Sequence, residues 1–184
     1  MTVCVPLGKG VLAIGAFILA ALCLLGMHRC FYMTDVNGRL LEVLQTAKDL
    51  QVAIWSYEYE YHAFPIAAEK GSDSHLRSRG QLLAELFPFD DAILNFKKVK
   101  FIDLPMARER KSGLWQDSGE WVLSDAWGEP FHIIIDTNED NVIANPDSDS
   151  AKATPQIPSR ILIYSSGPDR DPKTWHDNIC SWRD

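Results

Sequence analysis

Three aspartates stand close together near the end of the 184-residue chain, in the stretch YSSGPDRDPKTWHDNICSW from Tyr164 to Trp182. Carboxylates so crowded repel one another unless a cation or hydrogen-bond donors satisfy them. Ca²⁺ takes about six to eight oxygen ligands in flexible geometry, and aspartates supply them readily. The stretch therefore predicts a calcium-binding loop, and the alternative is a loop closed by its own Asx turns without an ion. The candidate ligands are three carboxylates and the oxygens of two serines: Asp169, Asp171, Asp177, Ser166 and Ser181.

A second group of oxygen donors lies in DTNEDNVIANPD, residues 136–147: Asp136, Asn138, Asp140 and Asp147. The first three follow the D-x-N-x-D spacing that opens an EF-hand loop. However, Asn141 replaces the glycine of the sharp turn, and Pro146 blocks a helix that would leave the loop. A plain hairpin turn is therefore the favoured interpretation of this stretch, and a second calcium site is the alternative.

The chain also contains residue types that could form a catalytic or transition-metal site. A hydrolase triad could draw on Ser165 or Ser166, His132 or His176, and Asp177. No G-x-S-x-G motif surrounds either serine, and the histidine beside Asp177 has no spacing typical of a general base. His176, Asp177 and Cys180 would give a transition metal three ligands in one loop without a fourth. We therefore expect a protein that is not an enzyme and has no small-molecule substrate, and a hydrolase is the least favoured function.

The elements that must carry these loops begin with an apolar run from Gly10 to Met27, which contains no charged residue. As a helix it would span about 27 Å, close to the thickness of the hydrocarbon layer of a bilayer. A buried core helix is the alternative, but soluble helices are seldom apolar on every side. The run is longer than the apolar part of a signal peptide, and no A-x-A site follows it. We predict an uncleaved transmembrane anchor in residues 1–30 and a folded domain in residues 31–184.

The charge of the folded domain limits its partners. The chain has 18 Lys and Arg against 25 Asp and Glu, and the thirty residues before Phe31 contain no acid. An acidic domain lacks the positive face that phosphates require, so nucleic acid is excluded as a partner. Lys9 and Arg29 flank the apolar run on either side, so charge alone does not fix its orientation in the membrane.

The pattern after the anchor predicts an α+β domain. Leu40, Leu44, Ala47 and Ile54 follow helical spacing, with Thr34 or Asp35 as a cap, and Pro65 ends the pattern. A short helix is expected in RGQLLAELF (79–87), and strands in KKVKFIDL (97–104), 131–136 and RILIYSS (160–166). Residues 66–79, 107–121 and 148–159 are expected to be loops, the second of them a loop or a hairpin. The fold class is thus a long N-terminal helix, with a membrane-spanning half and an amphipathic half, packed on a small antiparallel sheet with long loops.

Four features in this order resemble the type IV pilin-like family, and in particular the major pseudopilins of type II secretion systems. They are the membrane helix that runs into an amphipathic helix, the aromatic helix end WSYEYEYHAFP, the turn and strand DAWGEPFHI, and the closing stretch YSSGPDRDPKTWHDNICSW. The resemblance implies a pilin-like fold and a non-catalytic structural subunit whose C-terminal loop binds Ca²⁺. Asp169 and Asp177 match the acids of the family's closing motif, whereas Asp171 rests on spacing alone, and His176 stands where the family has a further acid.

The resemblance also implies location and partners: a single pass through the bacterial inner membrane, the folded domain in the periplasm, and association with copies of itself or with other pseudopilin or secretion components. The sequence departs from the family at the N-terminal processing motif. Family members have a glutamate at the fifth place after the cleavage glycine, whereas Ala13 or Gly15 stands there in this chain. The alternative function is therefore a membrane-anchored, calcium-stabilised periplasmic binding module that does not polymerise.

Overall fold

The computed structural model describes residues 36–66, 72–87, 89, 92–147 and 154–183. Contacts divide the chain into Met1–Arg39 and Leu40–Asp184, and the features below belong to the second unit except for the helical residues 36–39. The apolar run from Gly10 to Met27 and the predicted caps Thr34 and Asp35 lie outside the described residues. Within the described ranges, no helix combines the length and the apolar character needed to cross a membrane.

The chain is helical from residue 36 to residue 61, which confirms the predicted helix ahead of Pro65. The helix ends where His62 adopts a positive φ of 54°. Its inner face consists of residues three and four apart that are almost fully buried: Val43, Ala47, Leu50, Ile54 and Tyr57. This spacing puts one continuous apolar stripe against the rest of the domain. Two polar contacts reinforce it, because Gln51 Nε2 donates to the carbonyl of Ile161 at 2.8 Å and Glu58 forms an ion pair with Arg160.

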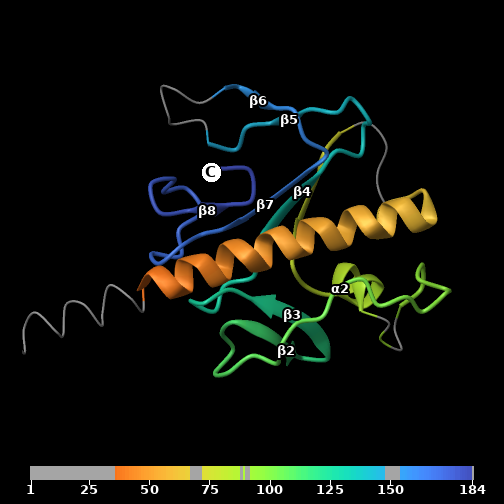
Figure 1. Ribbon diagram of the computed structural model, residues 1–184, viewed down its shortest axis with the longest axis horizontal. Coiled ribbons are helices and arrows are strands. Elements are labelled where there is room, and N and C mark those ends of the chain that lie inside the picture. The colour runs from red at the N-terminus through yellow and green to blue at the C-terminus, as the bar shows by residue number, and fades with distance from the viewer. Residues whose placement is uncertain (1–35, 67–71, 88, 90–91, 148–153, 184) are drawn as a thin grey trace, which may run out of the picture. The chain divides into compact units, whose positions relative to one another are not determined.

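The helix packs on a four-stranded antiparallel sheet with the strand order β1-β4-β7-β8 (Figure 1). These strands are β1 (Ser74–Arg77), β4 (His132–Ile135), β7 (Ile161–Ser165) and β8 (Ile179–Cys180). Ile133 pairs with Ile163 across β4 and β7, and both side chains join the core beneath the helix. Ile134 and Leu162, one position along each strand, belong to a second apolar cluster, as expected from the alternation of side chains in a strand. β7 is therefore buried on both faces, which explains why RILIYSS shows no polar alternation.

The other elements are short. Helix α2 (Gln81–Leu86) matches the predicted helix, and β2 (Gly113–Asp117) and β3 (Glu120–Ser124) form an antiparallel hairpin within and beyond the predicted loop 107–121. β5 (Ile143–Ala144) pairs with β6 (Gln156–Ile157). The described residues thus form an α+β fold in which one long helix packs on antiparallel sheets, as predicted.

The structure corrects three expectations about individual segments. β6 lies inside the predicted loop 148–159, where its pairing with β5 gives it strand conformation. Residues 97–104 contain no strand, because the side chain of Asn95 takes the place of a neighbouring strand: its Oδ1 accepts from the N–H of Val99 at 3.0 Å, and its Nδ2 donates to the carbonyl of Val99 at 2.7 Å. Conversely, β1 lies inside the predicted loop 66–79. Its sequence, SHLR, has one apolar residue, and its strand conformation depends on pairing with β4.

Candidate functional site

The C-terminal loop, residues 166–178, connects two paired strands and is closed at its base. Tyr164 pairs with Cys180 and Ser165 with Ile179 across β7 and β8. Immediately beyond, Gly167 has φ 69°, and a Cβ atom placed there would lie 2.3 Å from the carbonyl oxygen of Asp177. Only glycine permits both this conformation and this approach. The two ends of the loop therefore meet at Gly167 and Asp177.

The base of the loop is also attached to the turn that precedes β4. The Ser165 hydroxyl donates to Asp125 Oδ2 at 2.5 Å, and the Gly167 N–H donates to the same hydroxyl oxygen at 3.0 Å. The other carboxylate oxygen of Asp125 accepts from the N–H groups of Trp127 and Glu129, both at 2.9 Å. Asp125 and Ser165 are both buried. The stretches DAWGEP and YSSG, some forty residues apart in sequence, are thus joined by one buried polar network.

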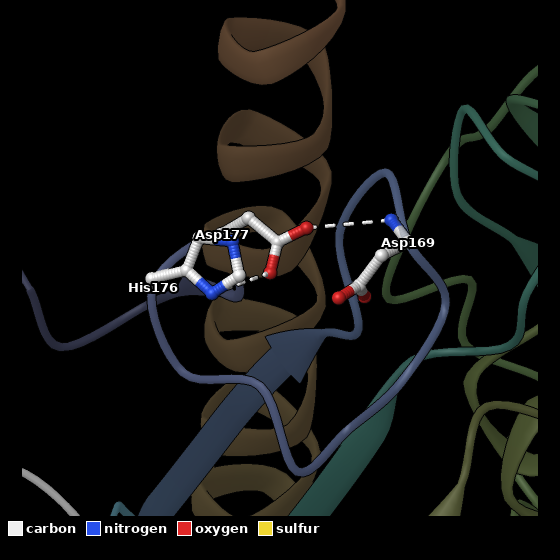
Figure 2. Close-up of side chains that lie close together, drawn as sticks. All are labelled: Asp169, His176 and Asp177. Atoms are coloured by element: carbon white, nitrogen blue, oxygen red, sulfur yellow. Dashed lines mark hydrogen bonds and ion pairs between the residues drawn. The ribbon is translucent and has the colours of Figure 1, made fainter.

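Asp169, His176 and Asp177 lie together on this loop, with their ligand atoms within 4.8 Å of one another (Figure 2). The Asp169 N–H donates to Asp177 Oδ2 at 3.3 Å, and His176 Nδ1 lies 3.7 Å from Asp177 Oδ1. Asp177 Oδ1 is buried and has no hydrogen-bond donor among the described residues. The pKa of Asp169 lies below its ordinary value because its carboxylate accepts from the hydroxyl of Thr174 and from the N–H of Asp171. Two carboxylates and an imidazole at this separation have the chemistry to hold a divalent cation.

The remaining predicted ligands make other contacts. Asp171 Oδ1 accepts from the Lys173 N–H at 3.0 Å, which is an Asx turn. The Ser166 hydroxyl lies 3.1 Å from His132 Nε2. The Ser181 hydroxyl oxygen accepts from the Ile163 N–H at 3.2 Å, within the sheet. Of the five predicted ligands, the structure therefore brings together Asp169 and Asp177, and it adds His176.

The calcium ligands predicted from the sequence do not include His176, although it stands beside Asp177 where the resembling motif has an acid. Cys180, the third residue of the transition-metal alternative, is buried in the apolar cluster on the other face of the sheet. Burial raises the pKa of Cys180 to about 12, so its thiolate does not form near neutral pH. The described geometry thus gives a metal the imidazole of His176 but no sulfur ligand from this loop.

In the second candidate group, the carboxylates accept from the backbone of their own turn. Asp136 is fully buried, and its oxygens accept from the N–H groups of Asp140 (3.3 Å) and Asn141 (2.9 Å). Asn138 Oδ1 also accepts from Asp140 N–H, at 3.1 Å. Asp147 forms an ion pair with Arg183 instead. This is the hydrogen bonding of a tight turn, but the turn does not form the hairpin favoured from the sequence, because β4 and β5 belong to different sheets.

A further acid, Asp73, lies close to this second group, and no pattern in the sequence indicates that it does. The pKa of Asp73 is raised by its burial and by the charges of Asp136 and Asp140. Asp73 Oδ1 is also buried without a hydrogen-bond donor among the described residues. Asp73 precedes β1, within the segment expected to be a loop, so its spacing in the sequence could not relate it to Asp136.

A serine and a histidine from the hydrolase alternative are in contact, but their surroundings differ from those of a catalytic pair. His132 Nε2 lies 2.7 Å from Arg77 Nη1 as well as 3.1 Å from the Ser166 hydroxyl, and Ser166 is buried. Burial and the Arg77 charge lower the pKa of His132 to about 4. A triad needs a carboxylate that stabilises the protonated imidazole, whereas a guanidinium opposes protonation. The contact between Ser166 and His132 therefore lacks the carboxylate that a triad requires at the histidine.

Comparison with known proteins finds no match: no model of a protein family, no curated protein and no solved structure matches this chain.

Proposed function

We propose that this protein is a non-catalytic, pseudopilin-like structural subunit of a type II secretion or type IV pilus-like apparatus. In this proposal the apolar run from Gly10 to Met27 anchors the chain in the bacterial inner membrane, and the α+β domain is pilin-like and lies in the periplasm. One observation supports it above the others. The two stretches that carry the most specific resemblance, DAWGEP and YSSG, contact each other through the hydrogen bond between Ser165 and Asp125.

We further propose that the C-terminal loop binds Ca²⁺ through Asp169 and Asp177. The support is the closeness of the two carboxylates and the buried oxygen of Asp177, which lacks a donor among the described residues. A cation in the loop would stabilise the junction between β7 and β8, because Asp177 lies directly before the strand pair closes. Its role would be structural, since it would hold the loop against the domain.

The test of the assembly role is to isolate the full-length protein from its native membrane after cross-linking and to identify what accompanies it. We expect copies of the same chain or other secretion or pilus components, and a mass that reports the state of the N-terminus. Recovery of the protein alone, with Met1 intact, would favour the alternative: a membrane-anchored, calcium-stabilised periplasmic module that does not polymerise. The missing glutamate near Ala13 and Gly15 is the observation that favours this alternative.

The test of the cation is thermal unfolding of the full-length protein with EGTA and then with added Ca²⁺. An ion that binds only the folded state adds about 2.7 kcal/mol when its free concentration is a hundred times the dissociation constant. We expect EGTA to lower the unfolding midpoint, Ca²⁺ to restore it, and Asp177→Asn to remove the response. Asp117→Asn, which changes an acid in the β2–β3 hairpin, is the matched control and should retain it. A midpoint that does not respond to either reagent would contradict the calcium proposal.

A further inference from the structure

A cleft of about 480 Å³ lies on the face of the four-stranded sheet that is turned away from the long helix. β1, β4 and β7 supply its floor through His75, Ile134 and Tyr164, and the C-terminal loop supplies a wall through Lys173 and Trp175. Small-molecule sites in proteins are typically concave, of about 300–1,000 Å³, and mostly apolar with a few convergent polar groups. The cleft has this size, its lining combines apolar side chains with two histidines, a tyrosine and a lysine, and no function proposed above uses it.

Aromatic rings form the inner surface of the cleft. The rings of His132 and Tyr164 are stacked, with centroids 4.5 Å apart and planes within 7° of each other. The ring of Trp175 lies 5.0 Å from that of Tyr164 at an angle of 44°. Flat, fixed rings of this kind favour a ligand that itself has a planar ring, because offset and edge-to-face contacts then become available.

Two of the polar groups that line the cleft, a phenol and an ammonium, can donate to a ligand. Tyr164 is 8% exposed, and its hydroxyl has no hydrogen-bond partner among the described residues. The ammonium group of Lys173 has no ion-pair partner in the described part of the chain, whereas the nearby Arg183 is paired with Asp147. None of the lining residues carries a carboxylate, although acids outnumber bases in the chain by 25 to 18. A site with an unpaired ammonium and an unpaired phenol, and no acid in its lining, favours an anion.

We propose that this cleft binds a ligand in which a carboxylate is joined to a planar aromatic ring through one or two carbon atoms, with the ring against Tyr164 and Trp175 and the carboxylate toward Lys173. Such a group occurs in free aromatic acids and at the C-terminus of a peptide that ends in an aromatic residue. The proposal concerns a ligand and involves no reaction. It does not depend on the assembly role or on the cation, because none of Asp169, His176 and Asp177 lines the cleft.

The test measures binding to the full-length protein in a non-ionic detergent by saturation-transfer NMR and calorimetry, with empty micelles as the blank. Phenylacetate represents the free acid and the peptide acetyl-Gly-Gly-Phe, with a free C-terminus, represents the chain end. Phenylacetamide lacks the charge, and acetate lacks the ring. We expect saturable binding of phenylacetate, of the peptide or of both, and at least about fivefold weaker binding of the two control compounds, the ratio that corresponds to one exposed ion pair or one ring contact.

Two conservative variants assign the binding to the cleft. Lys173→Met keeps the length of the side chain and removes its charge, and Tyr164→Phe keeps the ring and removes the hydroxyl. Each should weaken the binding about threefold to tenfold, whereas Lys48→Met, on an exposed position of the long helix, should leave it unchanged. The proposal is overturned if neither acid binds saturably, if phenylacetamide binds as tightly as phenylacetate, or if the Lys173 and Tyr164 variants bind like the unmodified protein.

Discussion

Replacement of Gly167 by alanine tests whether the C-terminal loop is closed by direct contact between its two ends. Gly167 has a positive φ of 69°, and a Cβ atom there would lie 2.3 Å from the carbonyl oxygen of Asp177 and 2.8 Å from its carbonyl carbon. Both neighbours are backbone atoms, so a side-chain rotation cannot relieve the overlap. The alanine can be accommodated only if the backbone at Asp177 moves away from β7.

The cost has two parts. An alanine with left-handed backbone angles is about 1–2 kcal/mol less stable than a glycine. This cost is offset by about 0.4–1 kcal/mol, because alanine restricts the unfolded chain. Forcing an extra methyl group into a close contact adds about 1–3 kcal/mol. We therefore expect Gly167→Ala to lower the free energy of unfolding by about 1–5 kcal/mol.

Gly119 provides the matched control. It also has a positive φ, 92°, but a Cβ atom placed there would meet nothing within 4 Å. Gly119→Ala should therefore show the backbone cost alone, about 1 kcal/mol or less after the offset. Urea unfolding of the full-length protein, followed by tryptophan fluorescence at 25 °C, measures both variants against the unmodified chain. If Gly167→Ala costs no more than Gly119→Ala, the close approach of the loop ends is wrong. In addition, Gly167→Ala should reduce the response to Ca²⁺, because it displaces Asp177 from Asp169.

Two further predictions concern groups on the sheet. His132 has a pKa of about 4 in the folded protein because of burial and the Arg77 charge, against about 6.5 in the unfolded chain. The unfolded state therefore binds more protons between these values, and stability falls as the pH is lowered from 6.5 toward 4, by about 1–2 kcal/mol after allowance for the partly exposed ring. Urea unfolding at pH 7 and pH 5 should show this loss, and in His132→Asn the difference should be smaller; an equal difference would contradict the assignment. The buried thiol of Cys180, with its pKa of about 12, should resist iodoacetamide in the native protein and react in urea. Peptide mass spectrometry reads this out, and prompt native labelling at Cys180 would contradict its burial.

The sequence predicts the helix and the inner strands because the burial of their faces produces a characteristic pattern of apolar residues. Of the residues predicted at helical spacing, Ala47 and Ile54 are buried and Leu40 and Leu44 are partly buried, and the unbroken apolar run of β7 corresponds to a strand covered on both faces. The errors about strands arise because a segment forms a strand only where another group pairs with its backbone, and its own pattern does not encode that partner. Residues 97–104 alternate as a strand does, but the side chain of Asn95 satisfies the backbone of Val99. β1 lacks alternation, and its pairing with β4 is a tertiary contact that its own sequence does not encode.

The candidate cation site is only partly predictable for a similar reason. Asp169 and Asp177 are eight residues apart, and they meet because the pairing of β7 with β8 and the conformation of Gly167 close the loop. By spacing alone, Asp171 is as good a candidate ligand as Asp169 and Asp177. In the structure its carboxylate accepts from the N–H of Lys173 instead. An aspartate in a loop can face a shared site or cap its own turn, and residue type does not distinguish the two. The proximity of Asp73 and Asp136 could not be predicted from the sequence, because the two residues lie on segments far apart in the chain.

The carboxylates of this domain differ in the hydrogen-bond donors that they contact. Those with several donors have a structural role, which distinguishes them from the candidate site. Glu85 is fully buried and accepts from the N–H groups of three consecutive residues, Ile93, Leu94 and Asn95. Asp125 accepts from two N–H groups and from the hydroxyl of Ser165. Such acids act as substitutes for missing strand partners, and they need no ion because backbone donors meet their charge.

Asp177 instead has one oxygen that accepts a long hydrogen bond from the N–H of Asp169, and its other oxygen is buried without a donor among the described residues. A second carboxylate, that of Asp169, lies beside it. A buried carboxylate oxygen left in this state is costly, and a divalent cation shared with Asp169 would remove that cost. Near the turn at Asp136, Asp73 Oδ1 and Asp147 Oδ1 are also buried without a donor among the described residues, although the Asp136 carboxylate accepts from two backbone donors. We therefore place the proposed cation in the C-terminal loop because the ligand atoms of Asp169, His176 and Asp177 lie together there.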